Sequence, residues 1–174
     1  MTNYDILSEN SEHHWPLSLL NTNNEILLDL GCGRHWTFEL KDSSPAHLGK
    51  EALKVISIDA SQQEIDYFNS TDLDKDKFTF ICTKIQSKED IINLINQYNP
   101  TVLKCDIEGF ETNFYDITKE EMSNIKEVGM EYHSYEILEK ISNKLTEWGF
   151  DIHTKARFAF VDAPQMGVLF CNRK

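Results

Sequence analysis

Short apolar runs recur along the chain at a spacing that predicts the strands of a sheet. Each run is five to seven residues long, rich in Val, Ile, Leu or Phe, and bounded by Gly, Pro or polar residues. The first, Glu25–Leu30, is almost continuously apolar, as expected of a strand buried on both faces of a parallel sheet. The seven predicted strands are Glu25–Leu30, Leu53–Asp59, Lys77–Cys82, Thr101–Asp106, Glu127–His133, Phe150–Ala156 and Gly167–Cys171.

Segments with helical periodicity lie between most of these runs. Ser87 is placed to cap the second of the long ones, and Gly149 follows the third, where a glycine commonly ends a helix. Pro45 and Gly49 interrupt the segment after the first strand, which therefore predicts only a short helix and a loop. The predicted helices cover residues 61–70, 87–98 and 134–148, with shorter ones after Thr118, which begins a capping-box pattern with Glu121, and within residues 34–50.

This alternation of strands and helices predicts an α/β fold, in which a mostly parallel sheet has helices on both faces. The last two strands are separated by residues 157–166, which contain Pro164 and have no helical period. We therefore expect these two strands to form an antiparallel hairpin at the C-terminal end of the sheet. Such a hairpin distinguishes the predicted fold from a plain dinucleotide-binding domain.

The length and charge of the chain limit its architecture and its partners. A chain of 174 residues suits a single domain, and we expect a polar N-terminal arm over residues 1–24 and one domain over residues 25–174. With 29 acidic and 17 basic residues, the net charge is −12, which disfavours nucleic acid as a partner. No apolar stretch approaches the ~20 residues needed to cross a bilayer, and the N-terminus is polar, so we expect a cytoplasmic protein without a membrane partner.

Two strand ends carry residues that are typical of a nucleoside site. Asp29 lies at the end of the first strand and Gly31 and Gly33 follow it, and such glycines allow the backbone to turn sharply and to approach a ligand closely. Asp59 ends the second strand, where a carboxylate can accept hydrogen bonds from both hydroxyls of a ribose. NAD would require a third glycine, but position 36 is Trp. A carboxylate before the glycines also suits the methionyl ammonium of S-adenosylmethionine better than a pyrophosphate.

Further ionisable residues mark the ends of the fourth and fifth strands. Side chains two residues apart share one face of an extended segment, so we expect Asp106 to point with Glu108, and Glu131 with His133. If these strands are neighbours, the four groups surround one crevice, and Lys104 can neutralise a carboxylate there. The cluster could hold a divalent cation that orients a substrate hydroxyl, or His133 could take the proton of that hydroxyl.

The segment around the fourth strand also resembles a known family. Leu103–Glu111, with the sequence LKCDIEGFE, is similar to the K-x-D-x-E-G-x-E signature of FkbM-type methyltransferases. The turn at Asp29–Gly33, the acidic strand end at Asp59 and the segment Met130–His133 match further pieces of the family in the same order. The resemblance extends over residues 25–172. It implies a class I Rossmann-like fold with strand order 3-2-1-4-5-7-6, bound S-adenosylmethionine, and O-methylation of a sugar or another small molecule.

One region departs from the family pattern. After the glycine turn the family commonly continues with Ala-Asn-x-Gly and a regular helix, whereas this chain has Arg34–Trp36. Asp59 comes 26 positions after Gly33, which is also more than the family usually has. We therefore expect a remodelled first crossover.

These observations lead to a functional hypothesis, an S-adenosylmethionine-dependent methyltransferase that acts on the hydroxyl of a sugar or another small molecule. The alternative is a non-catalytic nucleoside- or partner-binding module that retains the fold, because a remodelled crossover would weaken cofactor capture. The predicted cofactor-binding residues are Asp29, Gly31, Gly33 and Asp59, the predicted catalytic residues are Asp106, Glu108 and His133, and the candidate ligands of a divalent metal are Asp106, Glu108, Glu131 and His133.

Overall fold

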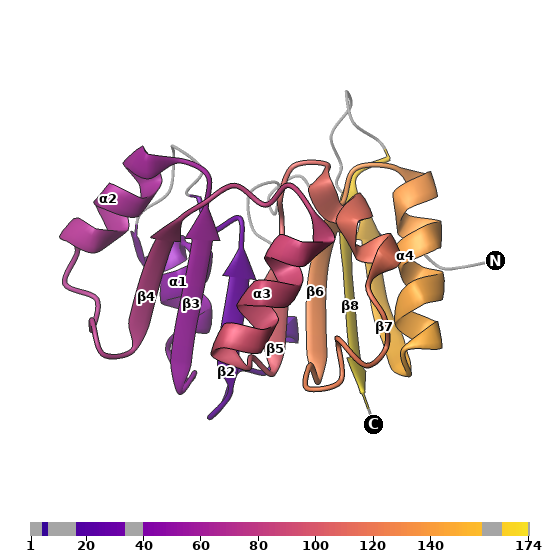
Figure 1. Cartoon of the computed structure of the whole chain (residues 1–174), viewed down its shortest axis with the longest axis horizontal. Helices are drawn as coiled ribbons and strands as arrows, with labels where there is room; N and C mark the ends of the chain where they lie inside the picture. The colour runs from indigo at the N-terminus through magenta and orange to yellow at the C-terminus, as the bar shows by residue number, and fades with distance from the viewer. Residues whose placement is uncertain (1–4, 7–16, 34–39, 158–164, 174) are drawn as a thin grey trace.

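Among the residues that the structure describes, eight strands form a single mixed sheet (Figure 1). The computed structural model describes residues 5–6, 17–33, 40–157 and 165–173. The strands are β1 (Asp5–Ile6), β2 (Ile26–Leu30), β3 (Lys54–Asp59), β4 (Phe78–Cys82), β5 (Val102–Cys105), β6 (Glu127–Tyr132), β7 (Phe150–Arg157) and β8 (Gly167–Arg173). All seven strands expected from the apolar runs are therefore present, with ends that differ by one or two residues.

The order of the strands confirms the predicted fold class. The sheet runs β1-β7-β8-β6-β5-β2-β3-β4, and without β1 this is the order 3-2-1-4-5-7-6 when read from β4. Strand β8 pairs antiparallel with both β6 and β7, whereas the strands from β6 to β4 pair in parallel. The C-terminal hairpin is thus confirmed, although residues 158–164 of its connection lie outside the described residues.

The sheet has one strand more than the sequence predicted. The two residues of β1 pair in parallel with β7 at the edge of the sheet, with Asp5 opposite Ala156 and Ile6 opposite Arg157. The 3-10 helix η2 (Leu17–Leu19) lies in the same N-terminal segment, and the side chains of Leu17 and Leu20 are buried in the core. Residues of the segment expected to be a polar arm therefore pack against the domain.

Helices cover the sheet as the periodicity predicted, with one exception. The segment that begins at Thr118 forms its capping box, because the N–H groups of Thr118 and Glu121 donate to the side chain of the other residue, but only turns follow. Figure 1 shows α3 in front of the sheet and α1 behind it. The helices are η3 (Leu40–Asp42), α1 (Ser44–Leu48), α2 (Gln62–Ser70), α3 (Lys88–Tyr98), η4 (Phe110–Asp116) and α4 (Tyr135–Glu147).

Alternate residues of the central strands form two separate apolar layers. Leu28, Ile56 and Leu103 belong to a core cluster that includes the buried faces of α3 and α4. Their neighbours Leu27 and Val55 belong to a second cluster, together with residues of η2 and α1. Because successive side chains of a strand point to opposite faces, a continuous apolar run fills both layers.

The described part of the first crossover, residues 40–53, holds only the two short helices η3 and α1, as its interruptions by Pro45 and Gly49 predicted. Ser43 caps α1, since its hydroxyl accepts the N–H of Ala46 at 3.4 Å. Trp36 lies outside the described residues. None of the helices among the described residues combines the length and the hydrophobicity that crossing a bilayer requires.

Candidate functional site

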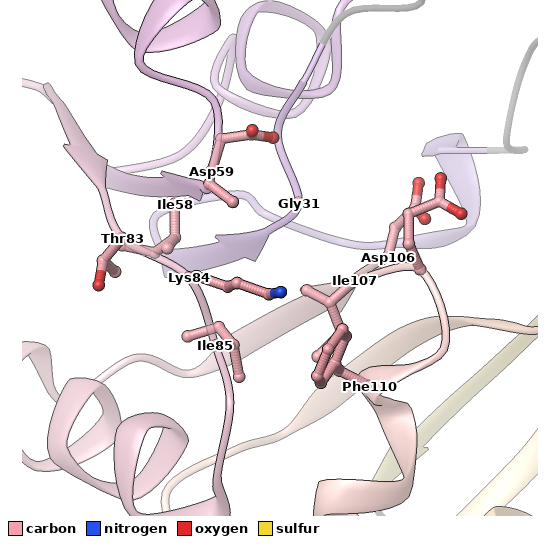
Figure 2. Close-up of a pocket in the computed structure, with 11 residues that line it drawn as sticks. Gly31, Ile58, Asp59, Thr83, Lys84, Ile85, Asp106, Ile107 and Phe110 are labelled. Atoms are coloured by element: carbon pink, nitrogen blue, oxygen red, sulfur yellow. The ribbon is translucent and has the colours of Figure 1, made fainter.

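A cavity of about 290 Å³ lies at the carboxyl ends of the four strands β2 to β5 (Figure 2). The chain leaves β2 toward β3 on one side and returns to β5 on its other side, so the cavity sits where the strand order reverses. Open α/β sheets bind their ligands at such a point. The lining residues are Gly31 from β2; Ile58, Asp59 and Ala60 from β3; Thr83, Lys84 and Ile85 after β4; and Asp106, Ile107, Glu108 and Phe110 after β5.

The glycine turn after β2 is packed against the chain after β5. Gly31 has a φ of +76°, and a Cβ atom at this position would overlap the backbone carbonyl of Asp106. The N–H groups of Gly31 and Cys32 both donate to the carbonyl of Ile58, at 2.9 and 3.0 Å. Only glycine meets both requirements, because it tolerates positive φ and has no side chain.

The Asp59 carboxylate is held in place by backbone groups on both sides. Its Oδ2 accepts the N–H of Gly33 at 2.7 Å, and its Oδ1 accepts the N–H of Ser61 at 2.8 Å. Ser61 in turn caps α2. A carboxylate has about four lone-pair sites, so each oxygen can accept one more hydrogen bond. Asp59 therefore presents a fixed acceptor pair at the wall of the cavity, as the ribose prediction requires.

Asp29 lies beneath the turn instead of on the cavity wall. Its side chain is 0% exposed and meets Lys104, whose Nζ is 3.1 Å from Oδ1, and Ser44, whose hydroxyl donates to Oδ2 at 2.6 Å. Lys104 also donates to the carbonyl of Gly31 at 2.6 Å. Burial alone would lower the pKa of Lys104, but the charges of Asp29 and Asp106 raise it above its usual value. Lys104 thus neutralises carboxylates at the crevice, while Asp29 acts on the cavity only through its neighbours.

Asp106 and Glu108 both line the cavity, but they do not share a strand face. Strand β5 ends at Cys105, and Glu108 has a φ of +53°, followed by Gly109 with a φ of +91°. The expectation that both side chains point together from one extended segment is therefore wrong, because the backbone is no longer extended at Glu108. The Glu108 side chain is 85% exposed, whereas that of Asp106 is 24% exposed and lies 3.8 Å from Nζ of Lys104.

Glu131 reaches the same region from β6 and is almost completely buried. Burial raises its pKa to about 10, and the neighbouring charge of Asp106 acts in the same direction. Glu131 is thus protonated at neutral pH. A carboxylate can only accept a hydrogen bond, so the side-chain hydrogen bond between Glu131 and Asp106 uses the proton of Glu131.

His133, directly after β6, lies between two carboxylates. Its Nε2 is 3.4 Å from Oε2 of Glu108, and its Nδ1 is 3.5 Å from Oε2 of Glu111. The side-chain hydrogen bond with Glu111 raises the pKa of His133, burial lowers it, and the net effect is an increase. His133 does not line the cavity itself; it contacts Glu108, which does.

Sequence reasoning missed two residues of this site. Glu111 is 0% exposed and contacts His133, and its place as the last residue of the LKCDIEGFE segment was the available signal. Lys84 extends across the cavity, with its Nζ 4.9 Å from the ring centroid of Phe110 (Figure 2). Nothing in the local sequence pattern sets Lys84 apart.

The structure does not support a divalent metal at this site. Within the described parts of the chain, no three His, Cys, Asp or Glu side chains are arranged to hold a metal ion. The candidate ligands Asp106, Glu108, Glu131 and His133 interact instead with Lys104, with Glu111 and with one another.

Cys32, Cys105 and Cys171 are buried and Cys82 is exposed, and all four are unpaired.

Comparison with solved structures identifies the fold. An rRNA methylase from Streptococcus thermophilus is 11% identical, with a TM-score of 0.60 over 90% of each chain. Precorrin-6y C5,15-methyltransferase from Geobacter metallireducens is 12% identical, with a TM-score of 0.59 over 91% of this chain and 85% of that protein. This chain has the class I methyltransferase fold. No family model and no curated protein matches the sequence itself.

A further relative with the methyltransferase fold was solved with a ligand. Fibrillarin from Aeropyrum pernix, in complex with natively bound S-adenosyl-L-methionine, is 9% identical, with a TM-score of 0.58 over 90% of this chain and 68% of that protein. At such low identities the likeness establishes the fold. A function for this chain has to be inferred from the residues that line its cavity.

Proposed function

We propose that the protein is an S-adenosylmethionine-dependent methyltransferase that methylates a hydroxyl of a sugar or another small molecule. One observation carries the proposal: in a methyltransferase fold, a cavity at the strand reversal presents the Asp59 carboxylate, which the N–H groups of Gly33 and Ser61 orient. Each oxygen of this carboxylate retains an acceptor site for a ribose hydroxyl. The resemblance of residues 103–111 to the FkbM-type signature supports the same cofactor and a hydroxyl acceptor.

We assign the methionyl ammonium to Asp106. Asp29 was expected to take this role, but it is fully buried and paired with Lys104. Asp106 is a carboxylate on the cavity wall, and its backbone lies directly against Gly31. A ligand whose ribose is held at Asp59 therefore extends past Gly31 toward Asp106. Asp29 and Lys104 position the Gly31 turn from below, through the hydrogen bond to the Gly31 carbonyl.

We assign the acceptor to the side of the cavity at Glu108 and His133. When bound, S-adenosylmethionine supplies an activated methyl group. The Nε2 of His133 can accept the proton of the hydroxyl that is methylated, and the adjacent Glu108 can orient the substrate by accepting a hydrogen bond from a second hydroxyl. Alignment of the reacting groups can contribute ~7–11 kcal/mol of the barrier reduction, so the fixed walls of the cavity matter as much as the base. A small neutral acceptor suits a site whose walls carry three carboxylates.

Calorimetric titration with two nucleosides tests both ends of this assignment. S-adenosylhomocysteine has an ammonium and a ribose, whereas 5′-methylthioadenosine has the ribose only. Asp59→Ala should weaken the binding of both ligands by roughly 1–3 kcal/mol, because the ribose hydroxyls lose their acceptor. Asp106→Asn should weaken S-adenosylhomocysteine by roughly 1.5–3 kcal/mol, the value of a charged hydrogen bond, and leave 5′-methylthioadenosine unchanged.

Asp72→Ala is the matched control, because it removes an exposed carboxylate from the loop between α2 and β4. Its affinities should equal those of the unaltered protein. Failure of the unaltered protein to bind either nucleoside would favour a non-catalytic, partner-binding module that retains the fold. For the acceptor, mass spectrometry should detect small molecules that gain one methyl group with the active protein and not with His133→Gln.

A further inference from the structure

We propose that Glu111 is a positioning residue that fixes the tautomer of His133, with the ring proton on Nδ1 and the lone pair of Nε2 directed toward the acceptor side. This inference rests on the proposed function insofar as it gives Nε2 a catalytic role. The orientation of the ring, however, is a property of the protein without ligand and can be tested separately.

The geometry connects Glu111 to both the turn and the ring. Glu111 lies in the first turn of η4, and its side chain is 0% exposed. Its Oε1 accepts the N–H of Ile107 at 3.2 Å, and its Oε2 lies 3.5 Å from Nδ1 of His133. Oε2 of Glu111 and Nδ1 of His133 are both buried without a hydrogen-bond partner among the described residues, which leaves each to interact with the other. One carboxylate therefore fixes the segment after β5 and faces the imidazole after β6.

The neutral ring has one N–H group, and either Glu108 or Glu111 can accept its hydrogen bond. The difference in burial between the two carboxylates determines which of them does. Glu108 faces Nε2 at 3.4 Å, but its side chain is 85% exposed, so water screens its charge. Glu111 faces Nδ1 at nearly the same distance from a fully buried position, where the attraction is several times stronger. The proton therefore stays on Nδ1, and Nε2 keeps its lone pair.

The other charged groups near the ring agree with this arrangement. Asp106 also acts on His133 from the end of β5, and it too is an acceptor. Glu131, near the end of β6, forms a side-chain hydrogen bond with Asp106. Of the three carboxylates that act on the ring, Glu108, Glu111 and Asp106, only Glu111 combines full burial with a contact to Nδ1.

Replacement of Glu111 by Gln gives a sharp chemical prediction. The N–H of Ile107 needs an acceptor, so the amide oxygen of Gln would remain on Ile107 and its NH₂ group would face Nδ1. Nδ1 would then have to accept a hydrogen bond, and the ring proton would move to Nε2. An amide in place of a carboxylate beside a catalytic imidazole traps the unproductive tautomer in this way.

The test is ¹⁵N NMR of the histidine rings in the ligand-free protein, at a pH at which the rings are neutral, with His133→Gln to assign the His133 signals. The unaltered protein should show His133 with its proton on Nδ1, and Glu111→Gln should show it on Nε2. In turnover assays Glu111→Gln should lower kcat by ~10²-fold or more and leave KM nearly unchanged, since general-base catalysis contributes ~10²–10⁴-fold.

Glu121→Gln is the matched control, because Glu121 also accepts a backbone N–H, that of Thr118, away from the ring. It should change neither the tautomer nor kcat. Glu111→Asp keeps an acceptor-only carboxylate and should keep the proton on Nδ1. A proton on Nε2 in the unaltered protein, or an unchanged tautomer in Glu111→Gln, would overturn the inference. Absence of methyl transfer with the expected tautomers would count against the proposed function alone.

Discussion

Glu131 and His133 are only two residues apart, yet different physical causes raise their pKa values. Burial dominates at Glu131, because a carboxylate loses its hydration there and cannot ionise next to Asp106. At His133 burial acts in the opposite direction, and the nearby carboxylate of Glu111 outweighs it. In both cases the folded protein holds its proton more tightly than the unfolded chain does.

Because the folded protein holds these protons more tightly than the unfolded chain, its free energy of unfolding depends on pH. The pKa of Glu131 is about 10 in the folded protein against an ordinary value of 4.5, so the folded state binds more protons in that range. The free energy of unfolding must therefore fall as the pH rises through it. His133 contributes in the same direction from 6.5 upward. We expect urea denaturation to show lower stability at about pH 9 than at about pH 6.

The variant Glu131→Gln measures how much of this pH dependence of stability comes from Glu131. The neutral amide can still donate a hydrogen bond to Asp106, so the variant should fold, but it has no proton to lose. Its stability should fall less between the two pH values than that of the unaltered protein. An identical pH dependence in both proteins would show that Glu131 does not titrate in this range.

At the scale of elements, two segments of the chain form a capping box, but only one of them continues as a helix. Ser87 and Asp90 cap α3 reciprocally: the Ser87 hydroxyl accepts the N–H of Asp90 at 3.3 Å, and Asp90 accepts the N–H of Ser87 at 3.0 Å. Thr118 and Glu121 form the same pair of bonds, but no regular helix follows. The difference lies in the length that follows, because α3 continues for 11 residues, whereas β6 begins at Glu127, soon after Glu121.

Removal of the α3 cap should have a measurable cost. Ser87→Ala leaves the N–H of Asp90 without its acceptor and should lower the free energy of unfolding by about 1 kcal/mol. Ser70 is an exposed serine at the end of α2, and Ser70→Ala should change the free energy of unfolding by less than about 0.5 kcal/mol. Chemical denaturation of the two variants makes the comparison. Equal losses would mean that the cap adds nothing specific to α3.

At the scale of the whole molecule, one buried ion pair joins the centre of the sheet. Asp29 on β2 lies directly opposite Lys104 on β5, and Ser44 of α1 binds the same carboxylate. These groups connect two neighbouring strands, the first crossover and the turn at Gly31. Because a buried charge that loses its partner is strongly unfavourable, the pair should be important for the stability of the entire domain.

Lys104→Met should therefore lower the free energy of unfolding by about 3–5 kcal/mol, as measured by urea denaturation. The double variant Asp29→Asn/Lys104→Met should recover part of this loss, since no unpaired charge remains. Lys126→Met is the matched control: Lys126 pairs with Glu25 at 2.7 Å, but its side chain is 59% exposed. Its loss should stay below about 1 kcal/mol. A similar loss in both single variants would argue against the importance of burial at Lys104.

The sequence by itself determined the seven main strands, the three long helices and the carboxylates at the strand ends. These features depend on residues near one another in the chain, because hydrophobic periodicity and capping are local properties. The prediction failed where few residues remained for a helix, as between Thr118 and the start of β6 at Glu127, and where the backbone turned at Glu108. It also could not anticipate β1, because two residues show no pattern and pair only when a sheet edge is available.

The partners and the protonation of each carboxylate depend on the tertiary structure and could not be read from the sequence. Lys104 and Gly31 are 73 residues apart in the chain, yet their hydrogen bond closes Asp29 off from the cavity. Glu111 and His133 likewise meet across two different elements. Burial and the charge of distant neighbours determine whether an acid is ionised, protonated or paired, and both arise only when the strands come together.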